Sequence, residues 1–237
     1  MSRVIPITTV LFDLNGTLTD PAAEPLRAAM HPAVAAILGI DERAYADALA
    51  ASYEARALGS HATTRALLAD VSARLGVAVD AARLDAASGE RLRQFARMLA
   101  PRAGAIETLT ALRSDGYVLG LVSDCSCETA EVWPQLPYAD LVEQPVFSCL
   151  VGVRKPAPAI YLEACRRLRV EPSACAFVGD GGSRELTGAR ALAMHAVRLR
   201  NDHLAGQAEH RVDPDHAFDG PAIADLRELP GLLRTLR

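Results

Sequence analysis

Residues 7–17 read ITTVLFDLNGT, an apolar run that ends in an aspartate and passes directly into a polar turn. An unbroken apolar run with several β-branched residues indicates a strand that is buried on both faces, as in parallel sheets. We therefore predict a strand over residues 7–14, with Asp13 near its carboxyl end, and a turn over residues 15–17. Ligands of open parallel sheets bind beyond the carboxyl ends of the strands, so this turn is the first candidate for a functional site.

Beyond residue 101, short apolar runs alternate with helical segments. This alternation predicts a parallel sheet with helices on both of its faces, so the expected fold class is α/β with a doubly wound parallel sheet. The expected strands span residues 117–122, 174–178 and 195–199, and the expected helices span residues 104–114, 157–169 and 184–193.

The stretch between residues 20 and 100 has a different character. It is rich in Ala, Leu and Arg, and Tyr45, Leu49 and Tyr53 recur every four residues, which indicates helix. Glycines at the expected helix ends divide the stretch into about four helices. We expect a helical domain over residues 20–100, inserted into an α/β core domain that consists of residues 1–19 and 101–237.

The composition is that of a globular protein. Of 237 residues, 50% are hydrophobic and 23% are charged, which is enough apolar material for a packed core and excludes intrinsic disorder. The net charge of −4, without a cluster of basic residues in the sequence, argues against nucleic acid as a partner. No apolar run approaches the roughly 20 residues that span a bilayer, so no membrane partner is expected.

The five cysteines are an odd number, and their spacing matches no paired CxxC motif for zinc or redox chemistry. We expect them to act as small buried hydrophobic residues. The apolar start of the chain is interrupted by Asp13 and is followed by no small-residue cleavage site, so we do not expect a signal peptide. A reducing, cytoplasmic location is the expectation that follows.

Polar residues gather at four places where strands or their connections end. Together they supply carboxylates, a hydroxyl and an ammonium, a set that suits an anionic substrate with a divalent cation. The ammonium belongs to Lys155, the single lysine among 25 basic residues, which suggests a site that needs a compact cation and not the planar fork of arginine. The four places are residues 13–17 (DLNGT), Ser123 with Asp124, Lys155 with Pro156, and residues 179–181 (GDG) with Glu185.

The order and spacing of these segments resemble the motifs of the haloacid dehalogenase-like hydrolase superfamily. Its members carry DxDGT, then a serine or threonine at a strand end, then Lys-Pro, then an acidic motif that begins with Gly-Asp. The resemblance extends over nearly the whole chain, and its most specific part is GVRKPAPAIY at residues 152–161 followed by FVGDGGSREL at residues 177–186. It implies a Rossmann-like core, a helical cap inserted after the first motif, and a Mg²⁺-dependent phosphatase that acts on a small phosphorylated metabolite.

The resemblance also implies roles for individual residues. Asp13 corresponds to the nucleophile, whose carboxylate attacks phosphorus and forms an aspartyl-phosphate. Lys155 corresponds to the cation that bridges the nucleophile and the phosphoryl oxygens. Ser123 and the backbone N–H of Asp124 match the pair that binds the phosphoryl group, and Thr17 belongs to the loop beside the substrate.

The implied metal ligands lie in the first and last motifs. The carboxylate of Asp13, the backbone carbonyl of Asn15 and the carboxylate of Asp180 match the ligands that hold Mg²⁺. Glu185 lies five positions beyond Asp180, where the family often places a second acid that acts directly or through a metal-bound water. A purely structural role for Glu185 at a helix N-terminus fits its position equally well.

Asn15 departs from the family pattern. The phosphatases have an aspartate there, which protonates the leaving oxygen and then activates water, and an amide side chain does neither. General acid–base catalysis contributes about 10²–10⁴ in rate, so turnover is the property that this change affects. Three explanations stay open: slow or different chemistry, a catalytically impaired binding or regulatory protein, or a substitution introduced to trap a complex.

A 2-haloacid dehalogenase-type hydrolase is a further alternative, because such enzymes also lack an acid at this position. They attack carbon and expel halide without a metal, so the acidic pair of Asp180 and Glu185 argues against this alternative. Arg56 and His61 fall near the end of a predicted cap helix, where capped relatives place specificity residues. Surface residues at a helix boundary would explain these two side chains equally well.

Overall fold

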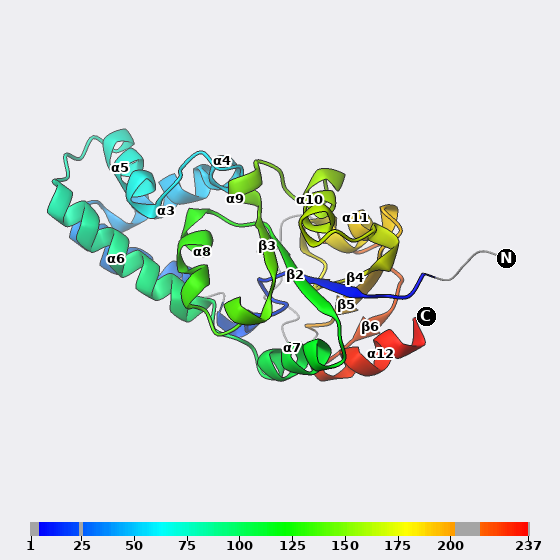
Figure 1. Ribbon diagram of the computed structural model, residues 1–237. Coiled ribbons are helices and arrows are strands. Elements are labelled where there is room, and N and C mark those ends of the chain that lie inside the picture. Colours follow the sequence, from blue (N-terminus) through cyan, green and yellow to red (C-terminus); the bar gives the residue numbers. More distant parts are fainter. Residues whose placement is uncertain (1–4, 24–25, 202–213, 237) are drawn as a thin grey trace.

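A computed structural model describes residues 5–23, 26–201 and 214–236 of the chain. Its core is a six-stranded sheet in the order β3-β2-β1-β4-β5-β6, in which every adjacent pair of strands is parallel. The sheet lies at the centre of the α/β part in Figure 1. The strands are β1 (Thr9–Phe12), β2 (Val118–Ser123), β3 (Gln144–Phe147), β4 (Cys175–Gly179), β5 (His195–Leu199) and β6 (Ala222–Ile223).

Helices cover both faces of the sheet (Figure 1). Side chains alternate along a strand, so Val10 and Phe12 of β1 pack into one core while Leu11 packs into the other. The predicted fold class, α/β with a doubly wound parallel sheet, is confirmed. The first face is covered by α7 (Ala105–Ser114) and α12 (Leu229–Thr235), and the second by α10 (Pro158–Leu168) and α11 (Glu185–Ala191).

The strand order reverses between β1 and β4. From β1 the chain builds β2 and β3 on one side, and it then returns to place β4, β5 and β6 on the other side. Phe12 of β1 is paired with Val178 of β4, and the N–H of Asp13 donates to the carbonyl of Val178 at 2.9 Å. A reversal of this kind opens a crevice beyond the carboxyl ends of the two strands, where Asp13 and Asp180 follow.

A second, all-helical part is inserted between β1 and β2, and we call it the helical insertion. It has its own hydrophobic core, which includes Val34, Leu49 and Leu67. In Figure 1 it extends away from the sheet on the side opposite to α12. Its helices are α1 (Leu26–Ala29), α2 (His31–Leu38), α3 (Glu42–Ala51), α4 (Tyr53–Ala57), α5 (Thr64–Arg74) and α6 (Ala81–Met98).

The described part of the helical insertion contains six α-helices, so the expectation of about four was too low. The extra boundaries arise where local hydrogen bonding competes with the helix. The Ser52 hydroxyl lies 2.9 Å from the carbonyl of Ala48, and this type of bond to the preceding turn bends helices, so α3 ends and α4 begins there. Pro32, in the first turn of α2, likewise separates that helix from α1.

Strands β3 and β6 lie at the two edges of the sheet and have no clear pattern in the sequence. β3 contains Pro145, which edge strands tolerate because one side of the strand makes no ladder hydrogen bonds. β6 has two residues, too few to show any alternation. Six short 3-10 helices complete the described secondary structure: η1 (Pro21–Ala23), η2 (Trp133–Gln135), η3 (Ala139–Leu141), η4 (Pro172–Ala174), η5 (Gly182–Arg184) and η8 (Leu226–Glu228).

The described part of the chain contains no helix that is both long enough and apolar enough to cross a membrane. All five cysteines are buried free thiols. Two pairs lie close together, with sulfur–sulfur distances of 4.0 Å between Cys125 and Cys149 and 3.9 Å between Cys165 and Cys175.

The helical insertion contacts the α/β core through α8 (Cys127–Val132) and α9 (Ser148–Val151), and a buried ion-pair network lies in this interface. The carboxylate oxygen Oε1 of Glu128 lies 2.6 Å from Nη2 of Arg91 and 3.8 Å from Nη1 of Arg56. Burial alone would raise the pKa of Glu128, but the two arginines outweigh it and lower this pKa to about 2. One carboxylate of the core therefore binds two helices of the insertion.

Glu128→Gln is expected to lower the free energy of unfolding by about 3–5 kcal/mol, because it leaves two buried guanidinium groups without their counter-ion. In the wild type, this ionic contribution is fully present above the carboxyl's usual pKa of 4.5 and is lost as the pH falls towards about 2. Urea unfolding at neutral pH measures the loss, with Glu143→Gln, at an exposed glutamate, as the control. A loss no larger than that of the control would contradict a stabilising role of the network.

Candidate active site

Asp13 lies directly beyond β1, in the crevice between β1 and β4, and its side chain is 7% exposed. Both of its carboxylate oxygens accept hydrogen bonds. Oδ1 accepts from Nζ of Lys155 at 2.5 Å, and Oδ2 accepts from the hydroxyl of Thr17 at 3.1 Å. Thr17 is fully buried, and its hydroxyl positions the Asp13 carboxylate. These two contacts hold the carboxylate in one orientation.

Lys155 reaches the crevice from the loop between α9 and α10, and its side chain is 3% exposed. Its Nζ atom also lies 2.5 Å from Oε2 of Glu185, so one ammonium bridges two carboxylates. Burial alone would lower the pKa of Lys155, but the negative charges of Asp13 and Glu185 outweigh it and raise this pKa well above its usual value. The ammonium therefore stays charged at any physiological pH.

Glu185 is the first residue of α11 and is fully engaged in hydrogen bonds. Oε1 accepts from the N–H of Gly181 at 2.9 Å, and the Tyr161 hydroxyl donates to the Glu185 backbone carbonyl at 2.9 Å. The carboxylate packs against Gly179 so closely that a Cβ atom at position 179 would collide with it. Burial, together with the charge of Asp13, raises the pKa of Glu185 well above its usual value.

Three carboxylates converge in the crevice. Oxygen atoms of Asp13, Asp180 and Glu185 all lie within 4.8 Å of one another. Three carboxylates against the single ammonium of Lys155 leave an excess of two negative charges when all are ionised. Hard oxygen ligands with this excess charge fit a divalent cation such as Mg²⁺, which would offset the repulsion among them.

Ser123 is the last residue of β2, which lies next to β1 in the sheet, and Asp124 directly follows it. The Ser123 hydroxyl is buried and has no hydrogen-bond partner in the part of the chain that the structure describes, which is costly for a buried polar group unless a ligand completes it. Asp124 is held by the backbone, because its Oδ1 accepts from the N–H of Lys155 at 3.0 Å. The strand end therefore presents an unused hydroxyl on a loop that is tied to the Lys155 segment.

The turn that contains Asn15 is held by residues that sequence reasoning missed. The carbonyl of Gly16, which has a φ of 75°, accepts from Nη1 of Arg102 at 3.0 Å and from Nδ2 of Asn201 at 2.9 Å. Asn201 lies just beyond β5, so the search for polar residues at strand ends could have found it. Arg102 is one of 25 basic residues, and no motif in the sequence distinguishes it from the others. Asn15 itself is half-buried in this turn.

The structure thus brings together five of the residues that the sequence singled out: Asp13, Thr17, Lys155, Asp180 and Glu185. Arg56 and His61 are not part of that cluster. His61 lies on the helical insertion, where its ring contacts Asp70 at 3.0 Å. Arg56 reaches the core, where Nη1 donates to the hydroxyl of Ser126 at 3.2 Å. Arg56 is therefore an interface residue, and its partner Ser126 lies three positions beyond Ser123 in the chain.

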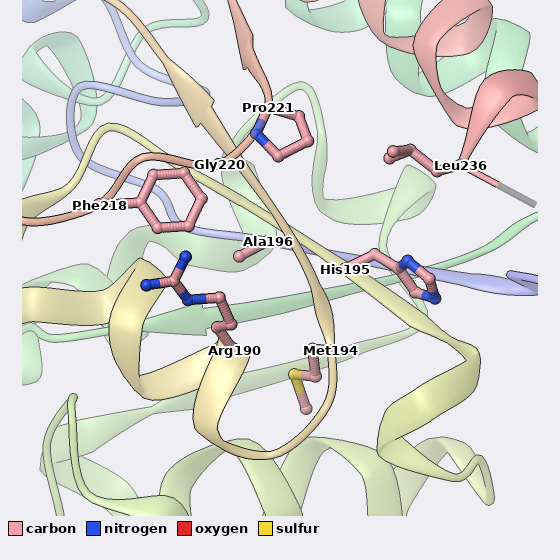
Figure 2. A pocket seen from close by; sticks show the side chains of 8 residues that line it. All are labelled: Arg190, Met194, His195, Ala196, Phe218, Gly220, Pro221 and Leu236. Atoms are coloured by element: carbon pink, nitrogen blue, oxygen red, sulfur yellow. The ribbon is translucent and has the colours of Figure 1, made fainter.

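A cavity of about 220 Å³ lies elsewhere in the molecule (Figure 2). It is found at the amino end of β5, whereas Asp13 and Asp180 follow the carboxyl ends of their strands. Cavities that enclose small ligands are usually larger, about 300–1,000 Å³. Because it lies at the opposite end of the strands, this cavity is separate from the candidate site. It is lined by Arg190, Met194, His195, Ala196, Phe218, Gly220, Pro221 and Leu236.

Several known proteins resemble this chain in sequence. The family described as haloacid dehalogenase-like hydrolase matches residues 7–192. A glyceraldehyde 3-phosphate phosphatase of Methanopyrus kandleri is 34% identical over 141 residues, which are 58% of this chain and 58% of that protein. A phosphoglycolate phosphatase of Xanthomonas campestris is 32% identical over 225 residues, which are 90% of this chain and 95% of that protein. The first of these matches thus spans less than two thirds of the relative's length.

A solved structure of a 2-haloacid dehalogenase from Pseudomonas syringae resembles this chain with a TM-score of 0.67. The alignment covers 98% of this chain and 100% of that chain, at 24% sequence identity. At this level of identity the likeness shows a shared fold and says nothing about a shared reaction.

Proposed function

Because this chain belongs to the haloacid dehalogenase-like hydrolase family, we propose that it is a Mg²⁺-dependent phosphatase that hydrolyses a small phosphorylated metabolite through an aspartyl-phosphate on Asp13. The observation that carries the proposal is the contact of one buried ammonium with the carboxylates of Asp13 and Glu185. Two relatives are named as phosphatases of small phosphorylated compounds, which supports this substrate class.

The residues around Asp13 prepare it for attack on phosphorus. Thr17 and Lys155 hold its carboxylate, so little reorientation is needed before an oxygen reaches the phosphorus atom. The Lys155 ammonium lies beside the nucleophile, where it would also meet the phosphoryl oxygens and stabilise charge that develops on them. The Ser123 hydroxyl and the N–H of Asp124 would donate to the same oxygens, which gives the buried Ser123 hydroxyl its missing partner.

We propose that Asp13, Asp180 and the backbone carbonyl of Asn15 hold the metal. Glu185 uses both carboxylate oxygens within the protein, so we assign it to the outer part of this site, where it acts on Lys155 and on the Gly181 N–H. A bound Mg²⁺ supplies neutralisation of the phosphate charge, which removes the repulsion between an anionic nucleophile and an anionic substrate. The three acids and the ammonium would then form a nearly balanced set of charges.

We further propose that residues 20–100 act as a cap over this crevice and that a reducing cytoplasm is the place of action. The cap proposal is supported by the position of the helical insertion, which contacts α8 and α9, the helices that follow the site strands β2 and β3.

Asn15 favours one alternative function, a binding protein of the same fold that does not turn over a substrate. The acidic cluster argues against a metal-independent dehalogenase.

The proposal predicts release of p-nitrophenol from p-nitrophenyl phosphate in the presence of Mg²⁺, and loss of that activity in EDTA. An aryl leaving group needs little protonation, so Asn15 does not prevent the first step with this substrate. The matched control is Asp13→Asn, which keeps the shape of the side chain and removes the nucleophile. Turnover that persists in EDTA or in Asp13→Asn would contradict the mechanism, and silence of both the wild type and Asn15→Asp would favour the binding protein.

A further inference from the structure

The proposed phosphatase needs a proton for its leaving oxygen, and Asn15 does not provide one. We propose that Tyr53, the first residue of α4, donates this proton from the helical insertion; this role rests on the function proposed above. Alkoxide leaving groups are strongly basic, so a phenol is acidic enough to protonate them as the bond to phosphorus breaks.

Tyr53 is held at the seam between the helical insertion and the core. Two guanidinium groups contact its ring, with the carbon Cζ of Arg154 5.3 Å and that of Arg56 5.7 Å from the ring centroid. Arg154 belongs to the core and directly precedes Lys155, and its Nε atom lies 3.5 Å from Oδ2 of Asp124. Figure 1 shows α4 next to α9 at this seam. The ring is therefore fixed beside the loop that we assign to phosphate binding.

The Tyr53 hydroxyl is available for a ligand. The hydroxyls of Tyr45, Tyr138 and Tyr161 each make a hydrogen bond within the protein. Within residues 5–23, 26–201 and 214–236, the half-buried Tyr53 offers its hydroxyl to no such partner. Arg154 contacts both the ring of Tyr53 and the carboxylate of Asp124, which places Tyr53 near the Asp124 loop. Burial raises the pKa of Tyr53, so the hydroxyl keeps its proton at neutral pH.

The step balances without any further reactant. A bond forms between an Asp13 oxygen and phosphorus, and the bond from phosphorus to the leaving oxygen breaks. The leaving oxygen keeps the electron pair and takes the proton of the Tyr53 hydroxyl. The resulting phenolate lies close to the positive charges of Arg56 and Arg154 and regains a proton from water before the next cycle.

The test removes the hydroxyl alone, through Tyr53→Phe, and compares two substrates. The readout is kcat/KM, which reports the steps up to release of the leaving group and is unaffected by slow hydrolysis of the aspartyl-phosphate. For glycerol phosphate, whose alkoxide needs a proton, we expect kcat/KM to fall by about 10²-fold or more. For p-nitrophenyl phosphate, whose leaving group is weakly basic, we expect little change.

Tyr45→Phe is the matched control, because it removes another hydroxyl of the helical insertion, one that accepts a hydrogen bond from Arg91 within the protein. It should leave the ratio of kcat/KM for the two substrates unchanged. Equal losses on both substrates in Tyr53→Phe, or no loss on either, would overturn the role of Tyr53 as proton donor. If the wild type turns over neither substrate with Mg²⁺, the phosphatase proposal itself fails, and the two failures are thereby distinguished.

A second measurement does not depend on how well the variant folds. In the wild type, kcat/KM across a series of phosphate monoesters should depend only weakly on the basicity of the leaving group, because the donated proton offsets the charge that develops there. A steep fall in kcat/KM with increasing basicity of the leaving group would show that no proton is donated, and it would exclude Tyr53 from this role.

Discussion

Asn15→Asp is expected to raise steady-state turnover of p-nitrophenyl phosphate by about 10² or more. Hydrolysis of the aspartyl-phosphate needs a base that takes a proton from water, and an amide does not accept one. In the protein as it stands, formation of the intermediate should therefore be faster than its breakdown. The new carboxylate replaces a half-buried amide of the same shape, so we expect the turn to keep its structure.

Rapid mixing with excess p-nitrophenyl phosphate tests this expectation directly. The wild type should give a burst of up to one equivalent of p-nitrophenol per site, followed by a slower steady rate, and Asn15→Asp should show no burst. Mass spectrometry of the acid-quenched wild type should find one phosphoryl group on the peptide that contains Asp13. Fast linear turnover by the wild type, with no gain in Asn15→Asp, would mean that another group activates the water.

Lys155→Arg is expected to reduce turnover by about 10²-fold or more while the fold stays intact. The Lys155 ammonium lies 2.5 Å from an oxygen of Asp13 and 2.5 Å from an oxygen of Glu185, in a space where the side chain is 3% exposed. A guanidinium keeps the charge but is larger and planar, so it does not fit between the two carboxylates at the same distances. The nucleophile and the acidic cluster would both move.

The measurement combines steady-state kinetics with circular dichroism, which confirms that the variant is folded. Arg190→Lys is the control for exchange of the two basic side chains, because Arg190 pairs with Asp219 at the surface, outside the site. It should leave activity unchanged. A Lys155→Arg variant with nearly normal turnover would show that any positive charge suffices at this position and that the single lysine has no special role.

The sequence was sufficient to predict much of the core. The apolar run before Asp13 and the later alternation of strands and helices predicted the central strands β1, β2, β4 and β5, because central strands of a parallel sheet are apolar on both faces. The edge strands β3 and β6 were missed, because an edge strand needs neither uniform burial nor freedom from proline. In the helical insertion, a serine and a proline added boundaries that the spacing of apolar residues does not reveal.

Within the candidate site, the motifs identified Asp13, Lys155, Asp180 and Glu185, but only the tertiary structure decides how they act on one another. Asp13 and Lys155 are separated by 142 positions and meet at 2.5 Å. The structure also places the Thr17 hydroxyl on the Asp13 carboxylate, and both carboxylate oxygens of Glu185 accept hydrogen bonds.

The sequence by itself determined the fold class and the residue types gathered at the strand ends, because periodic burial and short motifs are local properties of a chain. Only the tertiary structure decided the contacts of Arg102 and Asn201 with Gly16 and the contacts of Tyr53 with Arg56 and Arg154. Contacts of this kind depend on how a helix or loop is oriented when it packs against a distant one, and that orientation is set by the complete set of packed side chains.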